Sequence, residues 1–476
     1  MMKFTKIVAT IGPLTSSPKR INSLHKAGMD IARLNGSHNS LEWHEKTIKT
    51  IKKQIPMVPI LLDIPGKKIR TENLQIEPSF NANDIIVLTC DESYKGNNKI
   101  PLTNKKLHLF VKKGIKILAD DGTLSFLVQK VIKKDIYCLC LNKGKLRSKK
   151  GINVPNILLK QQLLTNKDKK FLDFAKRVGV DFIGISFVES KKHIEKIKKY
   201  LNSEFPKIVA KIENKEGLKN KDQIISYSDA IMIDRGDLSV ETDLDTIAIS
   251  QKEIINQAKF HSKPVIVATE MLHSMIENPF PTKAEVTDIS NSVLDGCSAT
   301  MLSGETAVGK YPEDSIKKMK EISFVSSLHI RKKQIFQVKK SNKDLIKNHM
   351  AQAVAHLCKN TPITKVVAIT KSGFAARSLS LLQISQPIIA VSDNVENART
   401  FNLFPGTKGV FVDIAFSKKN TDHIILCLKR LWKINILNIN DIVVVIGLSY
   451  PKSGNRFNHI QLHSINDLID ILGWKK

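Results

Sequence analysis

Short apolar runs recur along this chain, and stretches with the spacing of amphipathic helices separate most of them. The runs that share this pattern are KIVATIG, DIARLN, VPILLDI, DFIGISF, KIVAKIE, AIMIDRGD, PVIVATE and SATMLSG. Nearly continuous apolar strands that alternate with helices are typical of parallel strands buried on both faces. These eight units predict a chain of the α/β class that folds as a (β/α)8 TIM barrel.

The alternation is interrupted between the third and fourth runs. Residues 66–155 contain the strand-like runs DIIVLTC, GIKILADD, LSFLVQKVI and DIYCLCLN, separated by turns. We expect a small inserted β-barrel, hung from Pro65-Gly66 and Pro155, that can act as a hinged lid. After residue 330 a second α/β pattern begins. The predicted domains are the barrel, residues 1–65 with 156–330, the lid, residues 66–155, and a C-terminal α/β domain, residues 331–476.

Polar or charged residues end many of the predicted strands, at the edge where a barrel of this kind gathers its functional groups. They are Arg33, Asn35, Asp63, Lys211, Glu213, Asp237, Thr269 and Ser303. Lys211 and Glu213 stand two positions apart, so an extended strand points both to one side. Glu213 and Asp237 are hard oxygen ligands of the kind that magnesium takes from proteins. Two plainer interpretations stay open, a Lys211–Glu213 ion pair and a helix cap formed by Asp237.

Composition limits the remaining classes of protein. The chain carries 75 Lys and Arg against 45 Asp and Glu, a formal net charge of +30. The basic residues are spread as singles and pairs without an aromatic platform, so we expect a solvated surface and no nucleic-acid partner. No apolar run approaches the roughly 20 residues of a membrane span, and no signal-like segment is evident. The six cysteines form no CxxC motif, so we expect reduced thiols in a cytoplasmic protein.

Several longer stretches carry a resemblance to a known family. They are KIVATIGP, ARLNGSH, ILADDGTLS, KKGINVPN, VAKIENKEGLKN, RGDL, ATEML, NPFPTKAEVTDI and MLSGETAVGKYP. Through these stretches, in this order, the chain resembles the pyruvate kinases from end to end. The resemblance implies a barrel with a β lid after its third strand, a C-terminal effector domain and a homotetramer. It also implies the reaction of glycolysis in which phosphoenolpyruvate and ADP give pyruvate and ATP.

The same resemblance implies roles for residues at the strand ends. Glu213 and Asp237 are expected to hold Mg²⁺ or Mn²⁺. Lys211 resembles the lysine that stabilises the transferring phosphoryl group and the enolate oxygen, and Arg33 the arginine that holds the phosphoryl group. Thr269 matches the threonine at the face where the enolate is protonated, acting through water.

Two further binding regions follow from the resemblance. The backbone at Gly236 and Asp237, at a helix start, is expected to bind the substrate carboxylate. The residues expected on the nucleotide side are Asn35, His38, Arg70 and Lys150, with Asp121 reaching in from the lid.

One departure from the family concerns potassium. The family usually has a DTKGPEIR-like segment where this chain has DIPGKKIR, so Lys68 replaces the glutamate that accompanies potassium dependence. The resemblance implies a potassium-like pocket at Asn35, Ser37, Asp63 and Ile64, in which Ile64 lacks the usual threonine hydroxyl. We expect the Lys68 ammonium to take the role of the cation, so that the enzyme works without potassium. The plainer alternative is a Lys68 that faces solvent.

Other departures add negative charge near the predicted barrel mouth. Asp234 stands where the family normally has alanine, and Glu189 where arginine is common. A carboxylate at Asp234 would repel an anionic substrate unless it pairs, for instance with Arg235, or takes up a proton. Glu270 and Lys283 replace a usual glutamine and arginine. These changes motivate a second hypothesis, a diverged paralogue with altered substrate or weak activity, and a basic nucleic-acid-binding protein on this fold is a third.

The segment TKSGFAARS in the C-terminal part resembles the family's effector-phosphate loop. Thr370, Lys371, Ser372 and Gly373 would lie at a helix start, where backbone amides favour anions. The resemblance implies a sugar-phosphate effector. The alternative is an ordinary strand-to-helix turn with Ser372 as its N-cap.

Overall fold

Eight parallel strands form a closed barrel at the centre of the molecule. The computed structural model describes residues 4–66, 68–120, 122–155, 163–333, 345–417, 420–447 and 458–475. The barrel strands, in the order in which they pair, are β1 (Lys6–Thr10), β17 (Ala299–Leu302), β16 (Val265–Ala268), β15 (Ala230–Asp234), β14 (Lys207–Ile212), β13 (Phe182–Ile185), β3 (Ile60–Ile64) and β2 (Ile31–Asn35). The predicted (β/α)8 barrel is confirmed, and each strand falls within one of the eight apolar runs.

Helices cover the outside of this barrel. They are α1 (Pro18–Ala27), α2 (Leu41–Gln54), α3 (Asn166–Val178), α4 (Lys191–Leu201), α5 (Lys215–Lys219), α6 (Lys221–Tyr227), α7 (Arg235–Glu241), α8 (Ile247–Phe260), α9 (Lys283–Asp295), α10 (Gly304–Ala307) and α11 (Pro312–Lys333). Several begin where the sequence supplies a capping residue. In α9 the Thr282 side chain accepts from Glu285 N and the Glu285 carboxylate accepts from Thr282 N, so two backbone donors are satisfied at the helix start.

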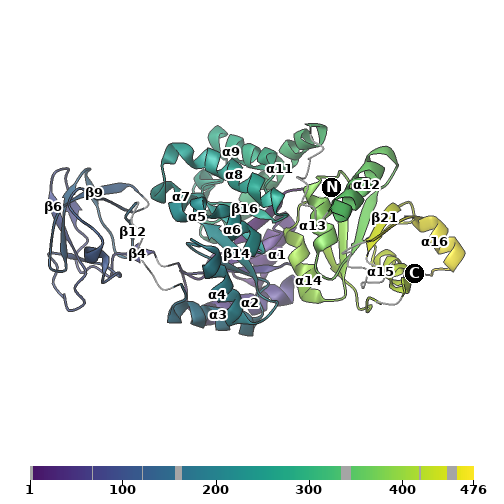
Figure 1. The fold of residues 1–476 in the computed structure, drawn as a ribbon, viewed down its shortest axis with the longest axis horizontal. Coiled ribbons are helices and arrows are strands. Elements are labelled where there is room, and N and C mark those ends of the chain that lie inside the picture. The colour runs from purple at the N-terminus through teal and green to yellow at the C-terminus, as the bar shows by residue number, and fades with distance from the viewer. Residues whose placement is uncertain are drawn as a thin grey trace.

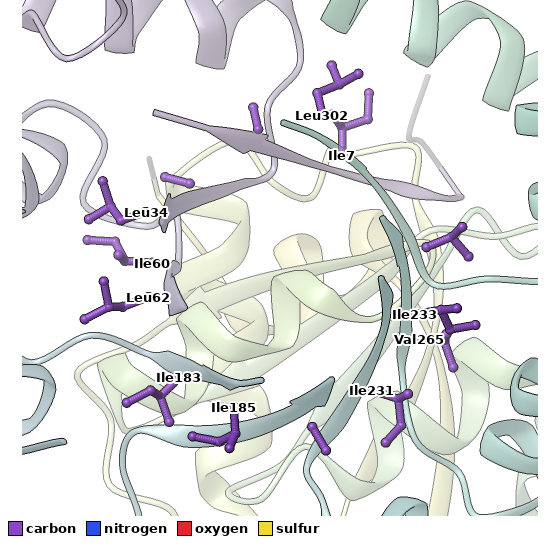
Figure 2. Close-up of a cluster of buried hydrophobic side chains, with 14 of the residues drawn as sticks. Ile7, Leu34, Ile60, Leu62, Ile183, Ile185, Ile231, Ile233, Val265 and Leu302 are labelled. Atoms are coloured by element: carbon purple, nitrogen blue, oxygen red, sulfur yellow. The ribbon is translucent and has the colours of Figure 1, made fainter. Parts of the chain in front are cut away.

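Alternate residues of the barrel strands divide between two apolar layers. Figure 2 shows one layer, in which side chains such as Ile7, Leu62 and Ile233 point outward from the ring of strands. The other layer fills the barrel interior and includes Val8, Ile31, Leu61, Phe182, Val209, Met232, Ile266 and Met301. A polar residue that is in phase with this inner layer at the end of a strand therefore faces into the barrel mouth.

The lid is an all-β insertion between β3 and β13. Its main sheet has the order β4 (Ile69–Arg70), β12 (Gly151–Asn153), β8 (Lys116–Ala119), β9 (Leu124–Ile132), β10 (Asp135–Cys140), β6 (Ile85–Thr89) and β7 (Ile100–Pro101). A bridge between Thr71 and Leu102 joins the two edges, so the sheet closes on itself. A second, two-stranded sheet pairs β5 (Ser79–Phe80) with β11 (Gly144–Lys145).

The C-terminal part is a separate α/β unit. Its sheet has the order β20 (Thr407–Phe411), β19 (Ile388–Ser392), β18 (Lys365–Ile369), β21 (Ile442–Gly447) and β22 (His459–Ser464), of which only β22 pairs antiparallel. Its helices are α12 (Leu345–Asn360), α13 (Phe374–Leu381), α14 (Val395–Thr400), α15 (Asp422–Lys433) and α16 (Ile465–Leu472). Figure 1 shows the lid at one end of the molecule, the barrel in the middle and this unit at the other end.

Two further expectations concern the whole chain. All six cysteines are buried and unbridged, as the absence of a CxxC motif predicted. None of the helices in the described ranges has the length and apolar character that a membrane crossing requires.

Candidate active site

Five charged side chains meet inside the mouth of the barrel. On β14 the outer-layer residues are Ile208, Ala210 and Ile212, so Val209 and Lys211 face inward, as does Glu213 directly after the strand. The same alternation turns Asp234 inward on β15, Arg33 on β2 and Asp63 on β3. All five are buried, and Glu213 is 0% exposed. The prediction that Lys211 and Glu213 share a face thus agrees with the geometry.

The Lys211 ammonium lies at the centre of this charged cluster. Its Nζ is 2.6 Å from Glu213 Oε1, 3.1 Å from Asp234 Oδ2 and 3.7 Å from Asp63 Oδ2. It also donates a 3.4 Å hydrogen bond to the Ser186 hydroxyl. Sequence reasoning did not select Ser186, although the residue follows β13 at the same edge of the barrel and could have been found by that position.

The pKa values in this cluster follow from burial and from the nearby charges. Burial would lower the pKa of Lys211, but Glu213, Asp234 and Asp63 outweigh it and hold the pKa well above its usual range. Burial raises the pKa of Glu213 above its usual range, against the opposing effect of Lys211. Burial also favours the neutral form of Asp234, yet Lys211 and Arg33 outweigh it, so the pKa of Asp234 is lowered. Lys211 therefore stays charged near neutral pH.

Arg33 is fixed by a buried ion pair with Asp63. The Arg33 Nη2 lies 2.7 Å from Asp63 Oδ2, the Nε donates to the same oxygen at 2.9 Å, and the Nη1 donates to Thr10 Oγ1 at 3.1 Å. Gly184 on the neighbouring strand makes room for this carboxylate, since a Cβ there would come within 2.0 Å of Asp63 Oδ1. The pair holds the guanidinium rigidly at the barrel mouth.

The expected metal ligands stand together. Ligand oxygens of Glu213, Asp237 and a third carboxylate, Asp234, all lie within 4.8 Å of one another, and no other group of this kind occurs in the described ranges. Glu213 Oε1 is buried, and apart from the Lys211 ammonium no donor in the described residues reaches it. A second ammonium, from Lys68, lies 2.6 Å from Asp237 Oδ1. Hard carboxylate oxygens gathered in this way fit a divalent cation such as Mg²⁺ or Mn²⁺, which would displace the ammonium groups from them.

Thr269 and Gly236 interact directly, which the sequence did not predict. The Gly236 N–H, expected to be available for a substrate carboxylate, donates to Thr269 Oγ1 at 2.8 Å. Thr269 has a φ of 71° and Glu270 a φ of 55°, a left-handed backbone that is uncommon for such residues. This conformation turns the Thr269 hydroxyl back onto the start of α7. A substrate carboxylate at that amide would have to replace the hydroxyl.

The pairing expected for Asp234 is wrong. Arg235 was its suggested partner, but Arg235 Nη1 pairs with Asp288 Oδ2 at 2.6 Å and its Nη2 donates to Thr269 O at 2.8 Å. Asp234 pairs with Lys211, because successive residues leave the strand on opposite sides and Arg235 already belongs to α7. The other added acid, Glu189, accepts a 3.0 Å hydrogen bond from Asn214 Nδ2.

The Lys68 ammonium is not found where the potassium hypothesis expected it. Asp63 is already paired with Arg33, and Lys68 pairs with Asp237 instead. Ile64 belongs to the outer apolar cluster, and its carbonyl accepts a 3.2 Å hydrogen bond from Ser186 Oγ. Ser37 is exposed, and its N–H donates to Asn35 Oδ1 at 3.1 Å.

The expected nucleotide residues divide between the barrel and the lid. His38 lies near both Arg33 and Arg70, since burial first and then these two arginines lower the pKa of His38. Arg70 Nη1 donates to Lys149 O at 2.9 Å, and Lys150 Nζ pairs with Asp120 Oδ1 at 2.7 Å, both within the lid. Asp121 lies outside the described residues.

The expected effector loop lies in the C-terminal unit, away from the barrel mouth. Thr370 Oγ1 accepts from Gly373 N at 3.1 Å, and Lys371 Nζ pairs with Asp393 Oδ2 at 3.1 Å. Gly373, with a φ of 73°, is the N-cap of α13, so the alternative that made Ser372 the N-cap is wrong. Ser372 is exposed.

Comparison with known proteins agrees with this geometry. The family model for the pyruvate kinase barrel domain matches residues 2–316, and the model for the pyruvate kinase alpha/beta domain matches residues 348–463. The chain belongs to the pyruvate kinase family. The "Pyruvate kinase" of Borreliella burgdorferi is 35% identical over 98% of both chains. Those of Staphylococcus saprophyticus and Geobacillus stearothermophilus are 36% and 35% identical over 98% of this chain and 81% of their own length.

Family membership confirms the main functional interpretation of the sequence. The chain is a pyruvate kinase and a phosphotransferase, with phosphoenolpyruvate, ADP, pyruvate and ATP as its substrates and products. Pyruvate kinases use a divalent metal, and the donor set at Glu213 and Asp237 fits one.

Proposed function

We propose that Lys211, Arg33 and Thr269 are the catalytic residues for phosphoryl transfer from phosphoenolpyruvate to ADP. The observation that carries this assignment is the buried Lys211 ammonium, held beside Arg33 at the barrel mouth by three carboxylates. Phosphoryl transfer asks little covalent chemistry of a protein, so positioning and charge stabilisation supply most of the rate. A bound Mg²⁺ or Mn²⁺, held by Glu213 and Asp237, would supply positive charge to the oxygens of the substrate and of the transferring phosphoryl group.

Each residue has a distinct task in this proposal. Arg33, fixed by Asp63, holds the phosphoryl group while it passes to the β-phosphate oxygen of ADP. Lys211 turns from its carboxylates toward the phosphoryl group and stabilises the negative oxygen of the enolate left behind. Thr269 faces the enolate carbon and directs, through water, the proton that completes pyruvate. The backbone of Gly236 and Asp237 binds the substrate carboxylate.

The nucleotide is bound between the barrel and the lid in this proposal. Its residues are Asn35, His38, Arg70, Lys150 and Asp121. Lid closure would exclude water, which otherwise competes for the phosphoryl group.

A coupled assay of pyruvate formation tests the assignment. Lys211→Met should reduce kcat by about a thousandfold or more, because a buried cation at the transferring phosphoryl group is lost. Lys207→Met is a matched control, since Lys207 lies on the same strand but pairs with Glu204. The assignment is wrong if Lys211→Met retains the wild-type rate. It also fails if Lys207→Met loses as much activity.

We further propose that this enzyme works without potassium. Lys68 motivates the proposal by its charge, because its ammonium lies at Asp237 and not in the pocket of Asn35, Ser37, Asp63 and Ile64, so it would replace the cation electrostatically and not by position. The assay is run in a buffer with tetramethylammonium as the only monovalent cation, and adding potassium should change the rate little. A many-fold rise in rate on adding potassium would contradict the proposal.

Regulation and assembly complete the proposal. We propose a sugar phosphate that binds at Thr370, Lys371, Ser372 and Gly373, and a calorimetric titration that shows no heat with any common phosphosugar would contradict this.

We also propose a cytoplasmic homotetramer, in which each chain is divided into domains at residues 66, 156 and 331. Light scattering after gel filtration measures its mass, and the mass of a single chain would contradict this.

A further inference from the structure

Asp234 is a buried carboxylate that pairs with Lys211 but neither caps its own helix nor pairs with its sequence neighbour. It is the N-cap residue of α7 by position, yet its side chain makes no capping hydrogen bond. The amide that a cap would satisfy, Gly236 N–H, donates to Thr269 instead. Its sequence neighbour Arg235 pairs with Asp288. Neither a helix cap nor a local salt bridge accounts for this acid.

The position of Asp234 is set by the barrel. Ile233 pairs in register with Ile212, so the next residues, Asp234 and Glu213, end adjacent strands side by side. Both face inward, and ligand oxygens of these two and of Asp237 lie within 4.8 Å of one another. Asp234 is 6% exposed. Its carboxylate therefore faces the same small volume as the two carboxylates that fit the family's metal.

Charge balance argues for a cation in that volume. Buried like charges destabilise one another unless a cation lies between them. Lys211 approaches Glu213 and Asp234 together, and Lys68 approaches Asp237. Three carboxylates thus face two ammonium groups, which leaves one net negative charge in this volume for a divalent ion to balance.

We propose that Asp234 is a third carboxylate ligand of the divalent cation and that it strengthens binding of the ion to the substrate-free enzyme. The inference rests on the proposed function, in which Glu213 and Asp237 hold the ion. Affinity of an oxygen site for a divalent ion rises with the number of charged ligands. With three protein carboxylates, fewer coordination positions depend on oxygens of phosphoenolpyruvate.

The test measures Mn²⁺ binding to the substrate-free enzyme by electron paramagnetic resonance, which counts free Mn²⁺. Asp234→Ala should raise the Kd for Mn²⁺ by about tenfold or more. Asp234→Asn keeps an oxygen but not the charge, so its Kd should lie between those of wild type and Asp234→Ala. Water-proton relaxation should show one more inner-sphere water on Mn²⁺ bound to Asp234→Ala. Glu189→Gln is the matched control, because it removes one negative charge from an acid outside the carboxylate cluster, and its Kd should change less than about twofold.

Several outcomes would overturn the inference. Equal Kd values for Asp234→Ala and wild type would do so, as would equal losses in Asp234→Ala and Glu189→Gln, which would indicate a general charge effect. If Mn²⁺ has the same number of inner-sphere waters in Asp234→Ala and in wild type, Asp234 is an ion-pair partner of Lys211 and not a metal ligand. Circular dichroism verifies folding, and Asp234→Asn carries the test if Asp234→Ala is unfolded. If wild type transfers the phosphoryl group and the Asp234 variants bind Mn²⁺ as tightly as wild type, this inference alone is refuted. If wild type binds Mn²⁺ but does not transfer a phosphoryl group from phosphoenolpyruvate to ADP, the proposed function is refuted.

Discussion

Single residues at the barrel mouth are held in place by their immediate neighbours. Lys211 is buried among three carboxylates, and Arg33 is bonded to Asp63 and Thr10. Such buried ionic groups contribute little net stability, because desolvation opposes their attraction. In this site the ion pairs fix the orientation of the Lys211 ammonium and of the Arg33 guanidinium. Gly184 belongs to the same arrangement, since it leaves the space that Asp63 occupies.

Replacing Gly184 should therefore disturb Arg33 through Asp63. In Gly184→Ala the new Cβ would come within 2.0 Å of Asp63 Oδ1, and we expect a loss of about 1–3 kcal/mol in unfolding free energy from overpacking, with a lower kcat. Urea unfolding and the coupled assay measure the two effects. A double-mutant cycle with Asp63→Ala isolates the cause. If Gly184→Ala destabilises the Asp63→Ala protein as much as wild type, the clash with Asp63 is not the reason.

Lys263 gives a pH dependence at the residue scale. Burial lowers the pKa of Lys263 to about 8, and its ammonium donates to Ser228 O at 2.5 Å. Because the unfolded lysine keeps its ordinary pKa, the unfolded state binds more protons between pH 8 and about 10.4. Unfolding free energy should therefore rise with pH through this window, by about 3 kcal/mol at most.

The Lys263 contribution is measured against Lys263→Met. Urea unfolding at pH 7.5 and pH 9.5 gives the free-energy difference between wild type and variant at each pH. That difference should move in favour of wild type as the pH rises. A difference that stays constant would mean that Lys263 has its ordinary pKa in the folded protein.

At the scale of elements, both connections of the lid are tied to one helix. Lys68, just before β4, pairs with Asp237 of α7, and Asn153 of β12 donates to Glu241 Oε1 of α7 at 2.6 Å. Figure 1 shows α7 on the side of the barrel that faces the lid. Since Asp237 is also an expected metal ligand, α7 joins the hinge of the lid to the active site.

Breaking the second tie should loosen the hinge without unfolding the lid. In Asn153→Ala we expect faster hydrogen exchange in β12 and α7, because the link to Glu241 is lost. Asn142→Ala is the control, since Asn142 bonds only within the lid, to Ser125 N and Thr123 O, among the hydrogen bonds of the described residues. Mass spectrometry of exchanged peptides measures both. Equal exchange in α7 for Asn153→Ala and wild type would contradict the role of this tie.

At the scale of the molecule, the C-terminal unit is attached to the barrel by buried and half-buried polar contacts. Arg399 Nε donates to Asp181 Oδ1 at 2.7 Å, and Asp181 is 1% exposed. Lys6 Nζ donates to Thr407 O at 2.6 Å, and Asn402 Nδ2 to Met57 O at 3.1 Å. These contacts lie at the other end of the barrel from the lid, as the arrangement in Figure 1 shows.

Removing Arg399 should destabilise the protein more than removing the whole ion pair. Arg399→Met leaves the Asp181 carboxylate buried without its cation, and we expect a loss of about 3–5 kcal/mol in unfolding free energy. The double variant Arg399→Met/Asp181→Asn keeps an acceptor for the Ile60 N–H but removes the buried charge. Part of the lost unfolding free energy should therefore return. Urea unfolding of the single and double variants measures this. A double variant no more stable than Arg399→Met would contradict the argument.

The sequence alone determined the elements and most of the candidate site. Eight apolar runs gave the eight barrel strands, since strands buried on both faces need continuous apolar residues. Polar residues at the ends of those runs placed Arg33, Lys211 and Glu213 at the barrel mouth, because parallel strands in a barrel end at the same edge. Those are local properties that the order of residues expresses directly.

The tertiary structure decided which charges pair. Asp234 faces Lys211 and not Arg235, because the closing of the barrel brings adjacent strands into register while Arg235 turns into α7. Lys68 reaches Asp237 across 169 positions of sequence, and that contact depends on how the lid is hung. Such pairings join residues that are far apart in the chain, so the hydrophobic periodicity of the sequence does not predict them. Only the folded barrel and its hinge bring these groups within bonding distance.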